Sequence, residues 1–192
     1  MGVSAISRRS SRGELGRRMV GLLILVPTSV LSFLLCLSGA VVAQRVGDEA
    51  ELDRLKAKAE DLMAHEDAEG AAMAMGRAAL MAAHLAKKET EPARMRLYRS
   101  VEHLSRSQEH GYRAMALFRR AGGTLPASGG VCSSLQLGQL ELQHAKTSLD
   151  EPSSPADPPD RGTATGLTPV LQGMDEWGTV LAAMQADYQC LQ

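Results

Sequence analysis

The sequence predicts an all-α protein: a small antiparallel helical bundle of four or five helices that follows an N-terminal hydrophobic signal or anchor helix. Apolar residues recur at intervals of three and four through most of the chain, which is the spacing of one helical face. Aromatic residues make up only 3% of the 192 residues, and β-branched residues are sparse outside residues 19–43. A β-sandwich or barrel needs runs of both kinds, so the composition argues against those folds.

The N-terminus has the features of a membrane-targeting segment. Residues 1–18 contain five Arg and one acidic residue, and such positive charge keeps a segment in the cytoplasm. Residues 19–43 are uncharged and almost wholly apolar, and about 20 helical residues suffice to cross a bilayer. Two interpretations stay open. A cleaved signal peptide fits Val41-Val42-Ala43, which has the small Ala43 at the last position and a tolerated Val two residues earlier. An uncleaved anchor fits the length better, because signal-peptide cores usually span about 7–15 residues.

Both interpretations place residues 44–192 outside the cytoplasm. Arg outnumbers Lys by 16 to 5 and Asn is absent, which is typical of a GC-rich bacterial genome. We therefore expect a bacterial periplasmic protein, secreted or anchored to the inner membrane through residues 19–43.

The predicted helical domain, 44–149, starts with helices over about 48–64 and about 69–88. Asp48 and Glu51 have the spacing of a capping box at the start of the first helix. The second helix consists largely of Ala and Met, which favour helix strongly. The apolar stripe of the first helix comprises Leu52, Leu55, Ala59 and Leu62.

A third helix is predicted over about 91–121. Pro92 suits a first helical turn, and the acidic Glu91 suits the positive end of the helix dipole. Gly122 and Gly123 end the helix. Its stripe alternates steps of four and three and comprises Leu97, Val101, Leu104, Gln108, Gly111, Met115 and Phe118.

Regularly spaced Leu residues predict a fourth helix over about 131–149. Residues 150–167 contain four Pro among Ser, Asp and Gly. Such a segment buries too little apolar area to offset its ordering entropy, so we expect a mobile loop. The last helix, 168–192, is predicted to begin with Thr168 as N-cap and Pro169 at the first helical position, and to pack on the bundle. Its stripe comprises Val170, Met174, Trp177, Leu181, Met184 and Tyr188.

The formal net charge of −1 conceals blocks of opposite sign. Residues 44–93 sum to −4, residues 94–121 to +5 and residues 122–192 to −6. We expect the basic third helix to be compensated by its acidic neighbours in the fold. Nucleic acid is not an expected partner, because the exported part carries a net negative charge.

Two of the three cysteines, Cys132 and Cys190, lie outside the apolar N-terminal segment. An even pair in an oxidising compartment favours a disulfide over two free thiols. The bridge would tie the end of the last helix to the start of the fourth across the Pro-rich stretch.

One pattern resembles a soft-metal site. Met73, Met81 and His84 fall within one sector of the second predicted helix, and thioethers with an imidazole suit Cu(I). Arg77 lies in the same sector and would repel a cation. Met at helical spacing is more often a core filler, which is the competing interpretation.

A second pattern, Glu141-x-x-His144, matches one half of the motif of carboxylate-bridged di-metal bundles. Those bundles need two such pairs and two further Glu, and no second pair occurs in this chain. The sequence therefore predicts that Glu141 and His144 belong to a solvated helical face, and that the protein has no cofactor.

No sequence motif for a nucleophilic triad, a zinc protease or a phosphate-binding loop occurs, so the sequence predicts a non-enzymatic protein. We expect it to act through helix-mediated protein interaction, as an accessory or scaffold subunit of the cell envelope or by self-association.

Gln108 and Gly111 interrupt an apolar stripe, which indicates either a close helix crossing or an unfilled groove for a partner helix. Arg113 and Trp177 complete the predicted interaction residues. A periplasmic metal-binding or stress-response protein is the alternative.

A second alternative is a tetratricopeptide-like adaptor. The offsets of Ala114, Phe118, Ala121 and Pro126 resemble the second helix of a tetratricopeptide repeat, with Tyr98 at the aromatic position of the first helix. Other positions depart from the pattern, and no second copy follows at a period of about 34 residues. This alternative predicts a break near Gln108–Gly111, whereas a bundle predicts one helix over about 92–121.

Overall fold

The computed structural model describes residues 47–150 and 161–190, with side chains from Leu167 onward in the second range. Every regular element in these ranges is a helix, so the all-α prediction is confirmed there. The elements are a helix over 47–64, α2 (Ala68–Lys88), α3 (Pro92–Arg120), α4 (Gly129–Asp150) and α5 (Arg161–Asp187). The predicted signal or anchor segment, 19–43, lies outside the described residues. Among the helices that are described, none combines the length and apolar character needed to span a bilayer.

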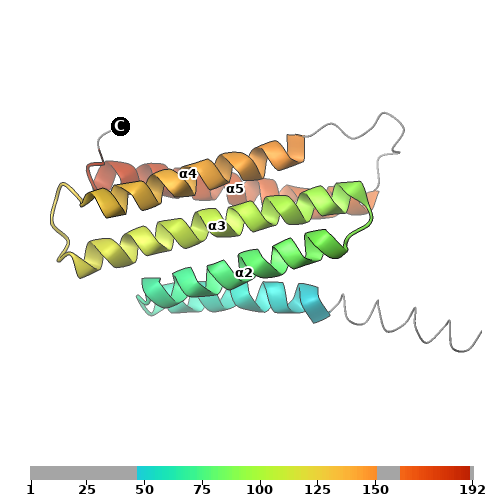
Figure 1. The fold of residues 1–192 in the computed structure, drawn as a ribbon, viewed down its shortest axis with the longest axis horizontal. Helices are drawn as coiled ribbons and strands as arrows, with labels where there is room; N and C mark the ends of the chain where they lie inside the picture. The colour runs from blue at the N-terminus through green and yellow to red at the C-terminus, as the bar shows by residue number, and fades with distance from the viewer. Residues whose placement is uncertain (1–46, 151–160, 191–192) are drawn as a thin grey trace, which may run out of the picture. The chain divides into compact units, whose positions relative to one another are not determined.

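Local sequence explains where two of these helices begin. The Asp67 carboxylate accepts a hydrogen bond from the backbone N–H of Gly70 at 2.8 Å, which satisfies one of the free N–H groups in the first turn of α2. Pro92 begins α3, where its missing N–H removes no helical hydrogen bond. Short loops join the first helices, so consecutive helices run alongside one another (Figure 1).

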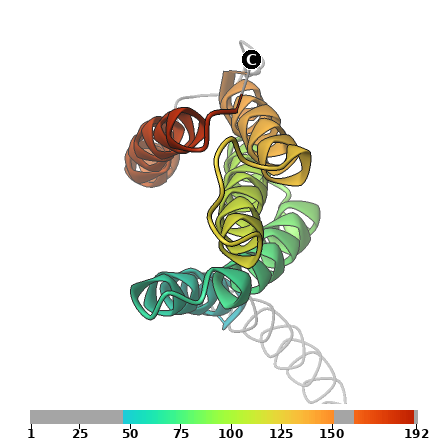
Figure 2. The same cartoon turned by 90° about the vertical axis from the view of Figure 1, so that its left-hand side faces the viewer.

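The central element is α3, which contacts each of α2, α4 and α5 (Figure 2). It is unbroken through Gln108–Gly111, so the interruption expected for a tetratricopeptide-like pair is absent. Two hydrophobic cores share this helix. The first lies between the 47–64 helix, α2 and the beginning of α3; its buried members include Leu52, Leu55, Met75, Leu85, Tyr98 and Val101. The second joins α3 to α4 and α5; its buried members include Ala114, Val131, Leu135, Met174, Trp177 and Leu181.

The disulfide prediction is confirmed. The sulfurs of Cys132 and Cys190 lie at bonding distance, 2.04 Å, with their Cα atoms 5.5 Å apart. The bridge joins the first turn of α4 to the residues just after α5. Next to it, the rings of Phe118 and Tyr188 stack with centroids 4.2 Å apart, so α3 also contacts this end of α5.

The start of α5 differs from the prediction. The helix begins at Arg161, within the expected loop 150–167, and Pro169 lies inside it. No proline occurs between Arg161 and Thr168, so nothing in that stretch prevents helix formation. Pro169 is exposed. It has no N–H, so the helix lacks one backbone hydrogen bond at this position.

Acidic residues of the first two helices partly compensate the basic α3, as expected. Arg94 Nη2 lies 3.0 Å from Glu49 Oε1, and Arg120 Nη2 lies 2.7 Å from Glu69 Oε2. Exposed ion pairs of this kind contribute only about 0–1 kcal/mol each. They therefore balance charge, and the two apolar cores supply most of the stability.

Candidate metal centre

Two buried hydroxyls set the register of α3 against α4. Ser100 Oγ donates to the carbonyl oxygen of Ala145 at 2.8 Å, and Ser107 Oγ donates to the carbonyl oxygen of Gly138 at 2.7 Å. Gly138 permits this close approach, because a Cβ there would lie 3.2 Å from the Ser107 carbonyl oxygen. Residues of α3 between the two serines therefore face residues 138–145 of α4.

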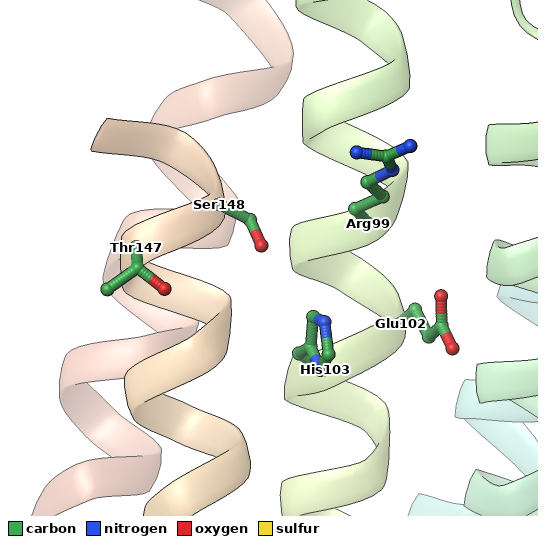
Figure 3. Close-up of a pocket in the computed structure, with 5 residues that line it drawn as sticks. All are labelled: Arg99, Glu102, His103, Thr147 and Ser148. Atoms are coloured by element: carbon green, nitrogen blue, oxygen red, sulfur yellow. The ribbon is translucent and has the colours of Figure 1, made fainter. Parts of the chain in front are cut away.

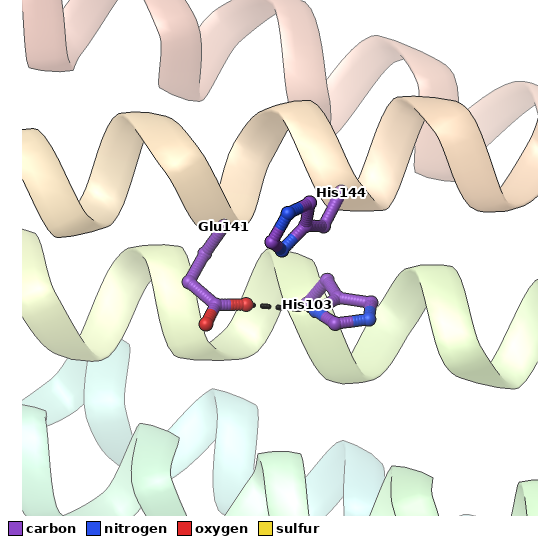
Figure 4. A group of neighbouring side chains, drawn as sticks. All are labelled: His103, Glu141 and His144. Atoms are coloured by element: carbon purple, nitrogen blue, oxygen red, sulfur yellow. Dashed lines mark hydrogen bonds and ion pairs between the residues drawn. The ribbon is translucent and has the colours of Figure 1, made fainter.

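This register brings His103 of α3 against Glu141 and His144 of α4 (Figure 4). One ligand atom from each of the three residues lies within 4.8 Å of the other two. His103 Nδ1 lies 2.7 Å from Glu141 Oε2, and the two imidazole rings meet edge to face with centroids 5.4 Å apart. The side chains of His103 and Glu141 are 29% and 22% exposed, and His144 is exposed, so solvent reaches the cluster from one side.

Two imidazoles and a carboxylate form a ligand set that suits zinc and related divalent ions. Ligand atoms in a tetrahedral zinc site lie about 3.4 Å apart, since each bond is about 2.1 Å long. Rotation of the exposed His144 side chain, with small adjustments of His103 and Glu141, would bring the three atoms from within 4.8 Å to that spacing. Three protein ligands leave the fourth tetrahedral position open, which is the arrangement of zinc sites that bind a water or another small ligand.

A cavity of about 480 Å³ lies beside this cluster (Figure 3). His103 belongs both to the cavity lining and to the metal cluster. Two other lining residues, Thr147 and Ser148, follow His144 by about one helical turn. The hydroxyls of Thr147 and Ser148 donate to the carbonyl oxygen of His144, at 3.1 Å and 2.8 Å. The cavity is lined entirely by polar residues: Arg99, Glu102, His103, Thr147 and Ser148.

His110 lies about two turns after His103 on α3 and is not part of the cluster. Its buried Nδ1 has no hydrogen-bond partner among the described residues. Burial lowers the pKa of His110; two nearby arginines add to this shift, and the carboxylates of Glu109 and Glu141 oppose it. Protonation of this imidazole is therefore disfavoured.

The metal site predicted from Met73, Met81 and His84 is not assembled. All three lie on the single helix α2, and a rise of about 1.5 Å per residue separates Met73 from His84 by roughly 16 Å along its axis. Met73 is 61% exposed beside Arg77, Met81 packs against the first core, and His84 Nε2 lies 3.8 Å from Asp48 Oδ2. A shared helical sector does not bring residues together when they are several turns apart.

The predicted interaction residues also need correction. Trp177 is 7% exposed and packs over Gly111 within the second core, so two helices cross closely there and the space at Gly111 is filled from within the chain. Trp177 Nε1 donates a hydrogen bond to Ser107 Oγ at 2.9 Å, so the one polar group of this indole has its partner inside the protein. Arg113 forms an ion pair with Glu109 one turn away. Gln108 is half-buried.

Sequence reasoning identified Glu141 and His144 but expected a solvated face and missed His103. Glu141 is instead half-buried and bonded to His103, a residue 38 positions away in the chain. No local motif marks His103. Only the register of α3 against α4 shows that it completes the set.

No protein-family model, curated protein or solved structure matches this chain.

Proposed function

We propose that this protein binds a divalent metal ion, in the first instance zinc, through His103, Glu141 and His144. The observation that carries the proposal is the convergence of three ligand atoms from two helices within 4.8 Å. This proposal keeps the metal-binding alternative of the sequence analysis but assigns it to different residues. The ion replaces the proton that His103 Nδ1 shares with Glu141, so acidification weakens binding through proton competition.

Metal titration of the full-length protein tests the proposal directly. We expect one zinc per chain, and one Co²⁺ with the visible spectrum of a tetrahedral site. His144→Ala and Glu141→Gln should each weaken binding at least roughly ten-fold, since even outer partners of metal ligands contribute roughly ten- to hundred-fold to affinity.

His84→Ala is the matched control, because His84 is an exposed histidine of α2 and belonged to the rejected ligand set. It should bind zinc as the unmodified protein does. Equal affinity in His144→Ala would refute the proposal and leave His103 and Glu141 as an ordinary hydrogen-bonded pair. Loss of affinity in His84→Ala would support the ligand set on α2 instead.

The site of action that we propose is the bacterial periplasm or the outer face of the inner membrane. The Cys132–Cys190 bridge supports this placement, since structural disulfides persist in oxidising compartments. The basic residues 1–18 and the apolar residues 19–43 support it from the sequence. The mature N-terminus, determined by mass spectrometry of the protein from intact cells, distinguishes a cleaved signal from an anchor.

A second proposed function is helix-mediated interaction with another envelope protein or a second copy. It is favoured by Met73 and Leu80, which are 61% and 64% exposed and lie two turns apart on one face of α2. A photocrosslinker at position 80 should yield one dominant adduct in intact cells, and one at the exposed Gln143 of α4, a helix that does not contact α2, should not. Adducts with the same chain alone would indicate self-association, and equal labelling from both positions would count against a specific contact.

A further inference from the structure

We infer that the cavity beside the proposed metal site binds a small phosphate-type oxyanion, which completes the coordination of the ion. The inference rests on the proposed function, because the metal ion supplies one of the two positive charges that hold the ligand. The other positive charge is the guanidinium of Arg99.

The cavity is a direct continuation of the metal cluster. Arg99 precedes His103 by four residues on α3, so the two side chains lie on one face of the helix about 6 Å apart along its axis. On α4, Ser148 follows His144 by the same interval. In Figure 3 the hydroxyl of Ser148 points toward α3, on the side where Arg99 and His103 lie.

Charge in the cavity favours an anion. Within the described ranges, Arg99 has neither a hydrogen bond nor an ion pair, in contrast to Arg94, Arg106 and Arg113 on the same helix. The one carboxylate in the lining, that of Glu102, lies 2.9 Å from Arg106 Nη2 and is neutralised there. Arg99 is exposed and therefore available to a ligand. Its planar guanidinium suits two oxygens of a phosphate group.

The hydroxyls point to the type of anion. The hydroxyls of Thr147 and Ser148 donate their hydrogen bonds to the His144 carbonyl. Their oxygen lone pairs can still accept a hydrogen bond from the ligand. Hydrogen phosphate and protonated phosphate monoesters carry such a donor, whereas an ionised carboxylate does not. The volume of about 480 Å³ falls within the range of small-molecule sites, and the mostly polar lining favours a polar ligand over an acyl chain.

Coordination chemistry links the cavity to the ion. His103, Glu141 and His144 leave one position of a tetrahedral ion open. A phosphate oxygen entering from the cavity would replace a water there, while Arg99 binds the remaining oxygens. No covalent bond to the protein forms or breaks.

The test uses the full-length protein loaded with Co²⁺ and titrated with inorganic phosphate. We expect phosphate to change the visible spectrum of the bound Co²⁺ in a saturable manner. Arg99→Gln should weaken the phosphate effect roughly ten- to hundred-fold while retaining Co²⁺ affinity, since a hydrogen bond to a charged group contributes that much. Arg77→Gln is the matched control, because Arg77 is an exposed arginine on α2, and it should titrate as the unmodified protein does.

The outcomes separate the two proposals. If Co²⁺ binds but phosphate leaves its spectrum unchanged, or acts equally on Arg99→Gln, the phosphate inference is overturned and the metal proposal stands. If no Co²⁺ binds, the metal proposal fails and the phosphate inference fails with it.

Discussion

The indole of Trp177 occupies the space that a side chain at position 111 would fill. A Cβ built on Gly111 would lie 2.5 Å from Cζ2 and 3.0 Å from Cη2 of Trp177. The largest side chain of α5 thus packs directly against the backbone of α3. Tyr112 meets the same indole edge to face, with ring centroids 5.3 Å apart.

Gly111→Ala should destabilise the protein by about 1–3 kcal/mol, because the rigid indole and α5 must shift to admit a methyl group. The free energy of unfolding, obtained from urea denaturation, measures the effect. Gly130→Ala is the control, since a Cβ at that helical position meets nothing within 4 Å. A stability of Gly111→Ala equal to that of Gly130→Ala would contradict the close crossing.

Ser107→Ala and Ser105→Ala should have opposite consequences although both residues are fully buried on α3. Ser107 accepts from Trp177 Nε1 and donates to the Gly138 carbonyl. Its loss leaves a buried indole N–H without a partner, at a cost of about 1–3 kcal/mol. Ser105 Oγ has no hydrogen-bond partner in the part of the chain that the structure describes, so alanine there should be neutral or stabilising. Equal losses in both variants, measured by thermal unfolding, would count against this assignment.

Reduction of the Cys132–Cys190 bridge should lower the free energy of unfolding by about 2–4 kcal/mol, because the opened chain gains conformational freedom in the unfolded state. Urea denaturation with and without reductant measures the loss. The double variant Cys132→Ser/Cys190→Ser should show the lower stability in both conditions. A reductant effect of the same size in that variant would point to a different cause.

Acidification should destabilise the fold in part through His110. Because burial lowers its pKa, the unfolded chain takes up a proton more readily than the folded protein does. This destabilisation is absent well above the usual histidine value of about 6.5 and grows as the pH falls toward the lowered pKa of the folded state. His110→Gln should therefore lose less stability between about pH 7.5 and about pH 5.5 than the unmodified protein.

His65→Gln serves as the control for this pH effect, since the His65 side chain is 74% exposed. It should lose as much stability on acidification as the unmodified protein. Indistinguishable pH profiles for His110→Gln and His65→Gln would show that the buried imidazole contributes nothing.

Zinc should raise the thermal unfolding temperature, because an ion that binds only the folded state stabilises it. At a free concentration about 100 times the dissociation constant, the gain is about 2.7 kcal/mol. A chelator should reverse the gain, and His103→Ala should abolish it. An equal rise in His103→Ala would locate the stabilising ion elsewhere.

Much of the fold follows from local sequence. Helix formation depends on apolar spacing and propensity over a few turns, and Asp67 and Pro92 act within a single turn. The predicted start of α5 is too late, because proline favours the first helical turn and Pro169 instead lies inside the helix. The sequence pattern revealed only two of the three candidate ligands. Glu141 and His144 lie one turn apart on α4, whereas His103 lies on α3.

The sequence by itself determined the helical class and the pairing of Cys132 with Cys190, the only two cysteines outside the apolar segment. Tertiary structure alone decided that His103 meets Glu141 and that Trp177 covers Gly111. The physical reason is that helical periodicity is a property of neighbouring residues. The register between two helices depends on contacts such as those of Ser107 with Gly138, which leave no local pattern in the chain.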